Sequence, residues 1–105
     1  MEYGLDTKYM EMIRSIFSRY PEVEKVILFG SRAKGNYKRG SDIDIAVTGE
    51  GVVKNTLSSL QGEFEDSLLP FFVDIISYSG IANSELKEHI DRVGKVIYER
   101  EACGC

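Results

Sequence analysis

Three aspartates are the side chains of this sequence best suited to chemistry. Asp42 and Asp44 lie two residues apart in the alternating segment Asp-Ile-Asp-Ile-Ala-Val (42–47), and Asp74 interrupts the apolar segment Phe-Phe-Val-Asp-Ile-Ile (71–76). Side chains two apart on a strand point to the same face, so the first two carboxylates have their roots about 7 Å apart on one side. Neighbouring carboxylates repel one another, and a hard divalent cation relieves that repulsion.

Asp74 adds a third acid whose surroundings are predicted to be apolar. A carboxylate buried without a partner is costly, so we expect Asp74 to face a partner or a metal ion. If the two strands are neighbours, three carboxylates converge and suit two divalent ions about 3.5–4 Å apart, as used for in-line nucleotidyl displacement. The alternative is a strand at the sheet edge whose acids prevent aggregation. That alternative explains Asp42 and Asp44 better when they are taken alone, and Asp74 makes the two interpretations about even.

Gly30 and Ser31 favour the metal-site interpretation. They follow a predicted strand and precede a predicted helical turn. Glycine allows a close approach of the backbone to a ligand, and the free N–H groups at a helix start attract an anion. The Ser31 hydroxyl adds a donor, and Arg32 in the first turn is placed to pair with phosphates. This combination supplies the phosphate-binding half of a metal–triphosphate site.

A concentration of positive charge surrounds this motif. Residues 30–41 hold four basic residues and no acid, so the segment carries +4, whereas the whole chain carries −4 and the remainder therefore −8. A broadly acidic protein is a poor general ligand for nucleic acids, so we do not expect direct nucleic-acid binding. The basic segment indicates a local anionic ligand such as a triphosphate, and on charge alone a solvated basic loop explains it equally well.

The elements that must position these residues are predicted from hydrophobic spacing. Helical spacing over 9–17 and 53–64, and a third helix that begins after Asn83 or Ser84, alternate with strands at 25–29, 42–47, 71–76 and 95–98. Residues 31–34 are expected to form one helical turn. We therefore predict an α/β (α+β) fold in which helices pack on a small mixed sheet.

The length and composition set outer limits on the function. A chain of 105 residues is expected to form one domain, residues 1–105. No apolar run is long enough to cross a bilayer and no signal peptide is visible, so we expect a cytoplasmic protein without a membrane partner. Two thiols, Cys103 and Cys105, cannot complete a zinc site alone. His89 is expected on an exposed helix face.

Gly30-Ser31, ten residues and then Asp42-Ile43-Asp44 resemble the signature of the DNA polymerase beta nucleotidyltransferase superfamily. The fuller segments Gly-Ser-Arg-Ala-Lys-Gly (30–35) and Gly-Ser-Asp-Ile-Asp-Ile-Ala-Val (40–47) are similar to its minimal nucleotidyltransferase branch, which includes MntA-like antitoxins paired with HEPN-domain toxins. With Asp74 as the third acid, the resemblance extends over most of the chain and implies the nucleotidyltransferase fold.

The resemblance also implies roles for individual residues. Gly30 and Ser31 would hold the triphosphate of ATP. Asp42, Asp44 and Asp74 would bind two Mg²⁺ ions, for which Mn²⁺ could substitute, and Asp74 would help to deprotonate the attacking hydroxyl. Further phosphate contacts would come from basic side chains, with Arg32 and Arg39 as the chosen candidates and Lys34 as another.

Three functions remain open on the sequence. The first is transfer of AMP to a tyrosine of a partner HEPN toxin, as in a type VII-like antitoxin, which implies a hetero-oligomer or a homo-oligomer. The second is a binding module that neutralises a toxin by contact alone. The third is a transferase that acts on a small molecule or a nucleic-acid end with a separate subunit. The acceptor and the nucleotide base are not determined by any sequence motif.

Overall fold

The structure, a computed structural model, describes residues 4–38 and 40–100. Arg39, Cys103 and Cys105 lie outside these residues. The helices and strands follow in the order α1 Thr7–Ser18, β1 Lys25–Phe29, α2 Ser31–Lys34, β2 Ile43–Thr48, α3 Lys54–Asp66, β3 Val73–Ser77, the 3₁₀ turn η1 Tyr78–Gly80, α4 Ser84–Val93 and β4 Lys95–Glu99. The predicted order of helices and strands is confirmed, including the helical turn at 31–34 and the short last strand.

The four strands form one mixed sheet in the order β3-β2-β1-β4. β1 runs antiparallel to both β2 and β4, whereas β2 and β3 run parallel. A parallel pair needs a crossover connection, and α3 provides it between β2 and β3. The two carboxylate-bearing strands are therefore direct neighbours, as the expected convergence required.

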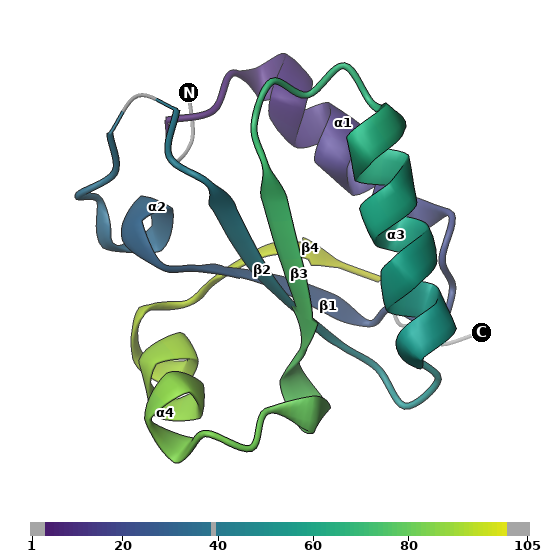
Figure 1. The fold of residues 1–105 in the computed structure, drawn as a ribbon, viewed down its shortest axis with the longest axis vertical. Helices are drawn as coiled ribbons and strands as arrows, with labels where there is room; N and C mark the ends of the chain where they lie inside the picture. Colours follow the sequence, from purple (N-terminus) through teal and green to yellow (C-terminus); the bar gives the residue numbers. More distant parts are fainter. Residues whose placement is uncertain (1–3, 39, 101–105) are drawn as a thin grey trace.

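Helices cover the two faces of the sheet unequally (Figure 1). α1 and α3 pack together on one face, where the main core contains Ile43, Ile45 and Val47 of β2, all fully buried. On the other face α4 covers a smaller cluster built from Phe29, Ala46 and Ile90. Alternation along β2 thus directs its isoleucines and Val47 into the main core and its aspartates to the face that carries α4.

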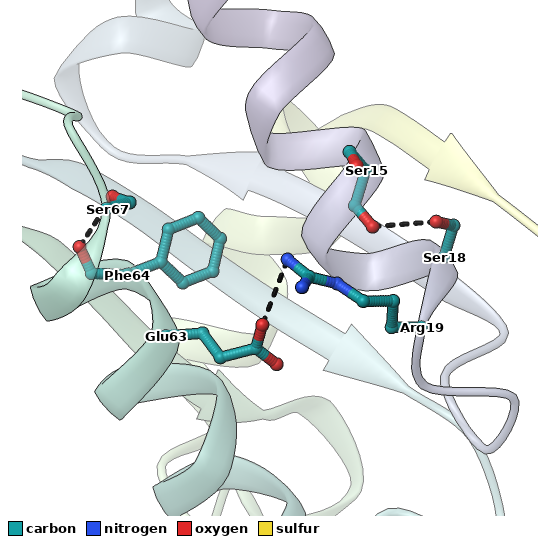
Figure 2. Close-up of polar contacts among 6 residues, drawn as sticks. All are labelled: Ser15, Ser18, Arg19, Glu63, Phe64 and Ser67. Atoms are coloured by element: carbon teal, nitrogen blue, oxygen red, sulfur yellow. Dashed lines mark hydrogen bonds and ion pairs between the residues drawn. The ribbon is translucent and has the colours of Figure 1, made fainter.

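α1 and α3 are joined by a charged contact at the end of α1 (Figure 2). The Arg19 guanidinium lies 2.9 Å from the Glu63 carboxylate, close to where Phe17 and Phe64 meet with ring centroids 5.5 Å apart. α1 ends at Ser18, shortly before Pro21, as expected because the residue before a proline is disfavoured in the helical conformation. No helix of the described residues is long and apolar enough to cross a membrane.

The start of α3 differs from the predicted apolar stripe. Val53, expected to face inward, is 56 % exposed, and Thr56 is buried in its place. The Thr56 hydroxyl accepts a hydrogen bond from the Val53 N–H at 3.3 Å and donates to Glu22 at 3.0 Å. A buried hydroxyl with both partners present costs little, so a polar residue can occupy the inner position.

Candidate active site

The three aspartates meet at one end of the sheet, on the face that carries α4. Asp44 of β2 and Asp74 of β3 are direct register partners in the parallel pair, and Asp42 precedes β2 by one residue. Adjacent strands lie about 4.8 Å apart, so the Asp44 and Asp74 side chains start from neighbouring positions. Asp42 and Asp74 are exposed and Asp44 is half-buried. The backbone register therefore brings the three aspartates to the same end of the sheet.

The electrostatics of the site centre on Asp44. Partial burial raises the pKa of the Asp44 carboxyl, and the nearby charges of Asp74 and Asp42 raise it further, while His89 opposes the shift. The fold thus holds like charges close together without an internal counter-ion strong enough to neutralise them. Such repulsion is what a bound divalent cation removes, and carboxylate oxygens are its preferred ligands.

The carboxylates fit a metal by chemistry and by register, but their side chains are not closed around a common point. Among residues 4–38 and 40–100, no three His, Cys, Asp or Glu side chains form a group that could hold a metal ion. Binding of an ion therefore requires rotation of the aspartate side chains, whereas the backbone positions that bring them together are already set by the β2–β3 pairing.

Gly30 lies directly against the Asp44 carboxylate. Phe29, the last residue of β1, pairs with Asp44, and the chain then turns at Gly30 with φ +77° and ψ −154°. A Cβ at this position would lie 2.4 Å from Asp44 Oδ2. The backbone angles require glycine, and a Cβ here would also displace the Asp44 carboxylate. The Gly-Ser segment therefore lies in direct contact with Asp44, and the half-buried Ser31 begins α2.

Arg32, predicted as a phosphate contact, has a buried side chain. Its side chain is only 2 % exposed, and its Nε and Nη2 atoms donate to the Ser41 carbonyl at 3.1 and 2.8 Å. The guanidinium also lies over the Tyr37 and Phe71 rings, at 5.4 and 4.7 Å from their centroids. Burial lowers its pKa, and the charges of Tyr37 and Asp42 act in the opposite direction. This geometry places the guanidinium inside the protein, fastened to the residue before Asp42, rather than facing a phosphate.

The rest of the basic segment forms a surface loop. Lys34 and Lys38 are exposed, and Arg39 lies outside the described residues. The loop ends in a tight turn in which the Ser41 N–H donates to the Lys38 carbonyl at 3.0 Å and the Lys38 N–H donates to Ser41 Oγ at 2.8 Å. This turn and the Arg32 contact fix Ser41, and so fix the direction in which the chain enters Asp42.

His89 belongs to the site, contrary to the expected exposed position. Its side chain is half-buried on α4, and its ring meets the Phe29 ring edge-on with centroids 6.3 Å apart and an interplanar angle of 83°. It also lies near enough to Asp44 to lower the pKa of that carboxyl. The spacing held a signal for this position, because residue 89 follows the inward Leu86 by three residues and adjoins the buried Ile90.

Comparisons with known proteins identify the family of the chain. Residues 11–102 match the family described as Polymerase beta, Nucleotidyltransferase. The chain is 32% identical over 100 residues to a Haemophilus influenzae protein named "Probable protein adenylyltransferase MntA", a match that covers 92% of this chain and 87% of the relative.

Solved structures share the fold. A toxin–antitoxin crystal structure with AMP-PNP superimposes with a TM-score of 0.69 at 23% identity, covering 92% of this chain and 76% of the other. The structure of a tri-AMPylated Shewanella oneidensis HEPN toxin in complex with an MNT antitoxin gives a TM-score of 0.59 at 20% identity, covering 86% and 72%. Together with the family match, these findings lead to one conclusion: the chain belongs to the polymerase beta nucleotidyltransferase family.

Proposed function

We propose that this protein transfers AMP from ATP to the hydroxyl of a tyrosine on a partner HEPN-domain protein. The observation that carries the proposal is the register of Asp44 with Asp74 beside Gly30. It brings the carboxylates that would bind the cation and the turn that would bind phosphate to the same end of the sheet. ATP as the donor places the activity in the cytoplasm.

The residues divide the work according to their positions. Asp42 and Asp44 would hold the metal, with Asp74 as a further ligand, and bound Mg²⁺ or Mn²⁺ would supply positive charge against the triphosphate. Gly30 leaves room for a phosphate next to Asp44, and the Ser31 N–H and hydroxyl would donate to its oxygens. Asp74 would accept the proton of the acceptor hydroxyl. The acceptor oxygen then bonds to the α-phosphorus as the bond to the bridging oxygen breaks and pyrophosphate leaves.

Arg32 would act at a distance from the phosphates. We propose that Arg32 holds Ser41 in place, because its Nε and Nη2 atoms donate to the Ser41 carbonyl. Ser41 in turn fixes the direction in which the chain enters Asp42. His89 would partly offset the rise in the pKa of the Asp44 carboxyl that burial, Asp74 and Asp42 cause. Lys34, Lys38 and Arg39 would attract the triphosphate as a group without a defined contact.

The named relatives support a protein as the acceptor. The Haemophilus influenzae relative is named as a protein adenylyltransferase, and one structural neighbour contains a HEPN toxin that carries AMP. An acceptor protein of this kind would present its own hydroxyl to the carboxylates.

Label transfer tests the proposal. The purified protein and Mg²⁺ are incubated with a purified HEPN-domain protein from the same source and with ATP labelled at either the α- or the γ-phosphate. We expect the partner to acquire the α-label only, and to gain the mass of one AMP on a tyrosine. Transfer of the γ-label, or label on an RNA end or a small molecule with none on the partner, would contradict the proposal.

A further inference from the structure

Exposed apolar side chains gather along one edge of the sheet. Within the described residues, five large apolar side chains are well exposed: Tyr37, Val53, Leu68, Phe72 and Val96. Three of these flank β3. Leu68, 90 % exposed, lies in the connection from α3 to β3, Phe72, 59 % exposed, immediately precedes β3, and Val53, 56 % exposed, lies near the far end of β3.

Two hollows accompany these side chains. One of about 180 Å³ lies at the start of β3 and is bordered by Phe64, Leu69 and Phe72. The other, of about 620 Å³, lies at the end of β3, where Val53 and Leu57 of the α3 region face Ile76 and Leu86. Both are lined mostly by apolar side chains. β3 therefore has a recess that can receive an apolar side chain at each end.

β3 is also an edge strand whose protection differs from that of the opposite edge. Edge strands are usually guarded by charges, above all by lysine. β4, the other edge, carries Lys95 and Glu99, and Glu99 pairs with Lys25 at 3.4 Å. β3 reads Val-Asp-Ile-Ile-Ser, so its only charge is Asp74 of the candidate site. The apolar edge is thus unguarded where the chemistry takes place.

A side chain from α3 covers part of the free β3 backbone. Gln61 Nε2 donates to the Val73 carbonyl at 2.6 Å. In a parallel pair, alternate residues direct their backbone groups to the neighbour, and the Ile43 N–H bonds to the Phe72 carbonyl, so the Val73 carbonyl faces outward. Because Gln61 occupies this acceptor, addition of a further strand is disfavoured at this point. The edge is better suited to a partner that inserts side chains.

From these features we infer that the β3 edge, defined by Val53, Leu68, Phe72 and the two hollows, is the surface on which the acceptor protein docks. The inference rests on the proposed function. The partner contributes apolar side chains on either side of its acceptor residue, which fill the two hollows while the hydroxyl reaches Asp74 between them.

The position of Asp74 identifies the occupant. Gly30 and Ser31 follow β1 on one side of Asp44, and Asp74 lies on the other side, on β3. A triphosphate at Gly30 therefore leaves the β3 side of the carboxylates open for the acceptor. Phe72 immediately precedes β3 and lies two residues before Asp74, so it is close to the point where the acceptor hydroxyl must arrive. A protein seated on this edge is the one positioned to be modified.

Partner affinity of surface variants tests the inference. Val53→Ser, Leu68→Ser and Phe72→Ser each remove an exposed apolar side chain, and Val96→Ser is the matched control because Val96 is 54 % exposed on the opposite edge. The dissociation constant for the HEPN-domain partner is measured by calorimetry without ATP, and label transfer is measured in parallel.

We expect Phe72→Ser to weaken partner binding about tenfold, the effect of losing a central interface side chain. Val53→Ser and Leu68→Ser should each weaken it several-fold, and the triple variant more than any single one. Val96→Ser should bind as the wild type does. All four should keep the circular dichroism spectrum and the KM for ATP of the wild type, since none touches Gly30, Ser31 or the carboxylates.

The outcomes separate this inference from the proposed function. If the wild type labels its partner and the triple variant binds that partner as tightly as the wild type, the docking surface is wrong and the activity stands. Equal losses in Val96→Ser and Val53→Ser would also overturn the inference. If the wild type binds the partner through the β3 edge but transfers no AMP, the proposed function fails and the surface stands. A wild type that neither binds nor labels the partner overturns both.

Discussion

Replacement of Asp44 by asparagine should stabilise the metal-free protein while it abolishes catalysis. Asp44→Asn keeps the size of the side chain and removes the charge that Asp74, Asp42 and partial burial all disfavour. Sites that hold like charges together for function commonly gain stability when one charge is removed. The variant therefore measures the cost of assembling the site.

The magnitude follows from the register of the two strands. Asp44 and Asp74 start from positions about 4.8 Å apart. Two unit charges about 5 Å apart repel by roughly 3 kcal/mol at an effective dielectric constant of about 20 and by about 0.8 kcal/mol in bulk water. Because Asp44 is half-buried and Asp74 is exposed, the value should lie toward the lower end. We expect a gain near 1 kcal/mol, which corresponds to a rise in Tm of about 4 °C for a domain of this size.

The sign of the pH dependence provides a second check. The raised pKa of Asp44 means that the folded protein holds this proton more tightly than the unfolded chain does. Its contribution to stability is present below the ordinary aspartate pKa of about 3.9 and is lost as the pH rises through the raised value. The advantage of Asp44→Asn should therefore be full at neutral pH and should shrink as the pH is lowered.

The assay is thermal and urea unfolding of both proteins with EDTA, followed by the same measurement with Mg²⁺. Magnesium should stabilise the wild type and have little effect on the variant, because a ligand stabilises only the protein that binds it. Glu50→Gln, a neutralisation in the exposed turn after β2, is the matched control for net charge. The reasoning is refuted if Asp44→Asn is less stable than the wild type at pH 7 with EDTA, or if Glu50→Gln gains as much.

Two further pairs of substitutions test the supports of the site. Gly30→Ala should cost about 1–3 kcal/mol of stability and most of the activity, because an alanine here has a strained backbone and its Cβ contacts Asp44 Oδ2. Gly35 also has a positive φ, but open space surrounds it. Gly35→Ala should therefore cost about 1 kcal/mol and leave the activity intact in the same unfolding and label-transfer assays. Arg32→Lys should cost about 2 kcal/mol, since lysine cannot make both bonds to Ser41, and should raise the Mg²⁺ concentration needed for half-maximal transfer more than the KM for ATP. A selective rise in the KM for ATP with unchanged stability would instead indicate that Arg32 contacts phosphate. Arg19→Lys is the matched control. It alters an ion pair in which the Arg19 side chain is 60% exposed, so it should change the free energy of unfolding by less than about 1 kcal/mol.

The sequence predicted the helices and strands correctly where apolar residues recur with the period of a helix or a strand. The alternation of 42–47 correctly predicted which side of β2 enters the core, because Ile43, Ile45 and Val47 are all fully buried. The order of helices and strands followed from the same spacing rules. That β2 and β3 are neighbours was only a condition in the sequence argument, since strand order depends on packing among distant segments.

Two side chains near the ends of elements have surroundings that local spacing did not predict. Arg32 was expected to contact phosphate because it is basic and lies in the first turn after Gly30, and that role stays a prediction; in the fold Tyr37 and Phe71 enclose its guanidinium, which donates to the Ser41 carbonyl. Tyr37 and Ser41 lie in the loop that follows Arg32 and Phe71 lies far along the chain, so the spacing within one helical turn does not bring them together. His89 was placed on the surface because its neighbours Glu88 and Asp91 are charged, although half-buried positions border such residues on every amphipathic helix.

The central claim is that the three aspartates carry a metal-dependent transfer of AMP to a partner protein. The double variant Asp42→Asn with Asp44→Asn tests it most directly, because it removes two carboxylates without altering the β3 edge. With α-labelled ATP, Mg²⁺ and the HEPN-domain partner, we predict strong labelling by the wild type, and none by the double variant or with EDTA, while the double variant still binds the partner. Labelling that survives the double substitution would contradict the account.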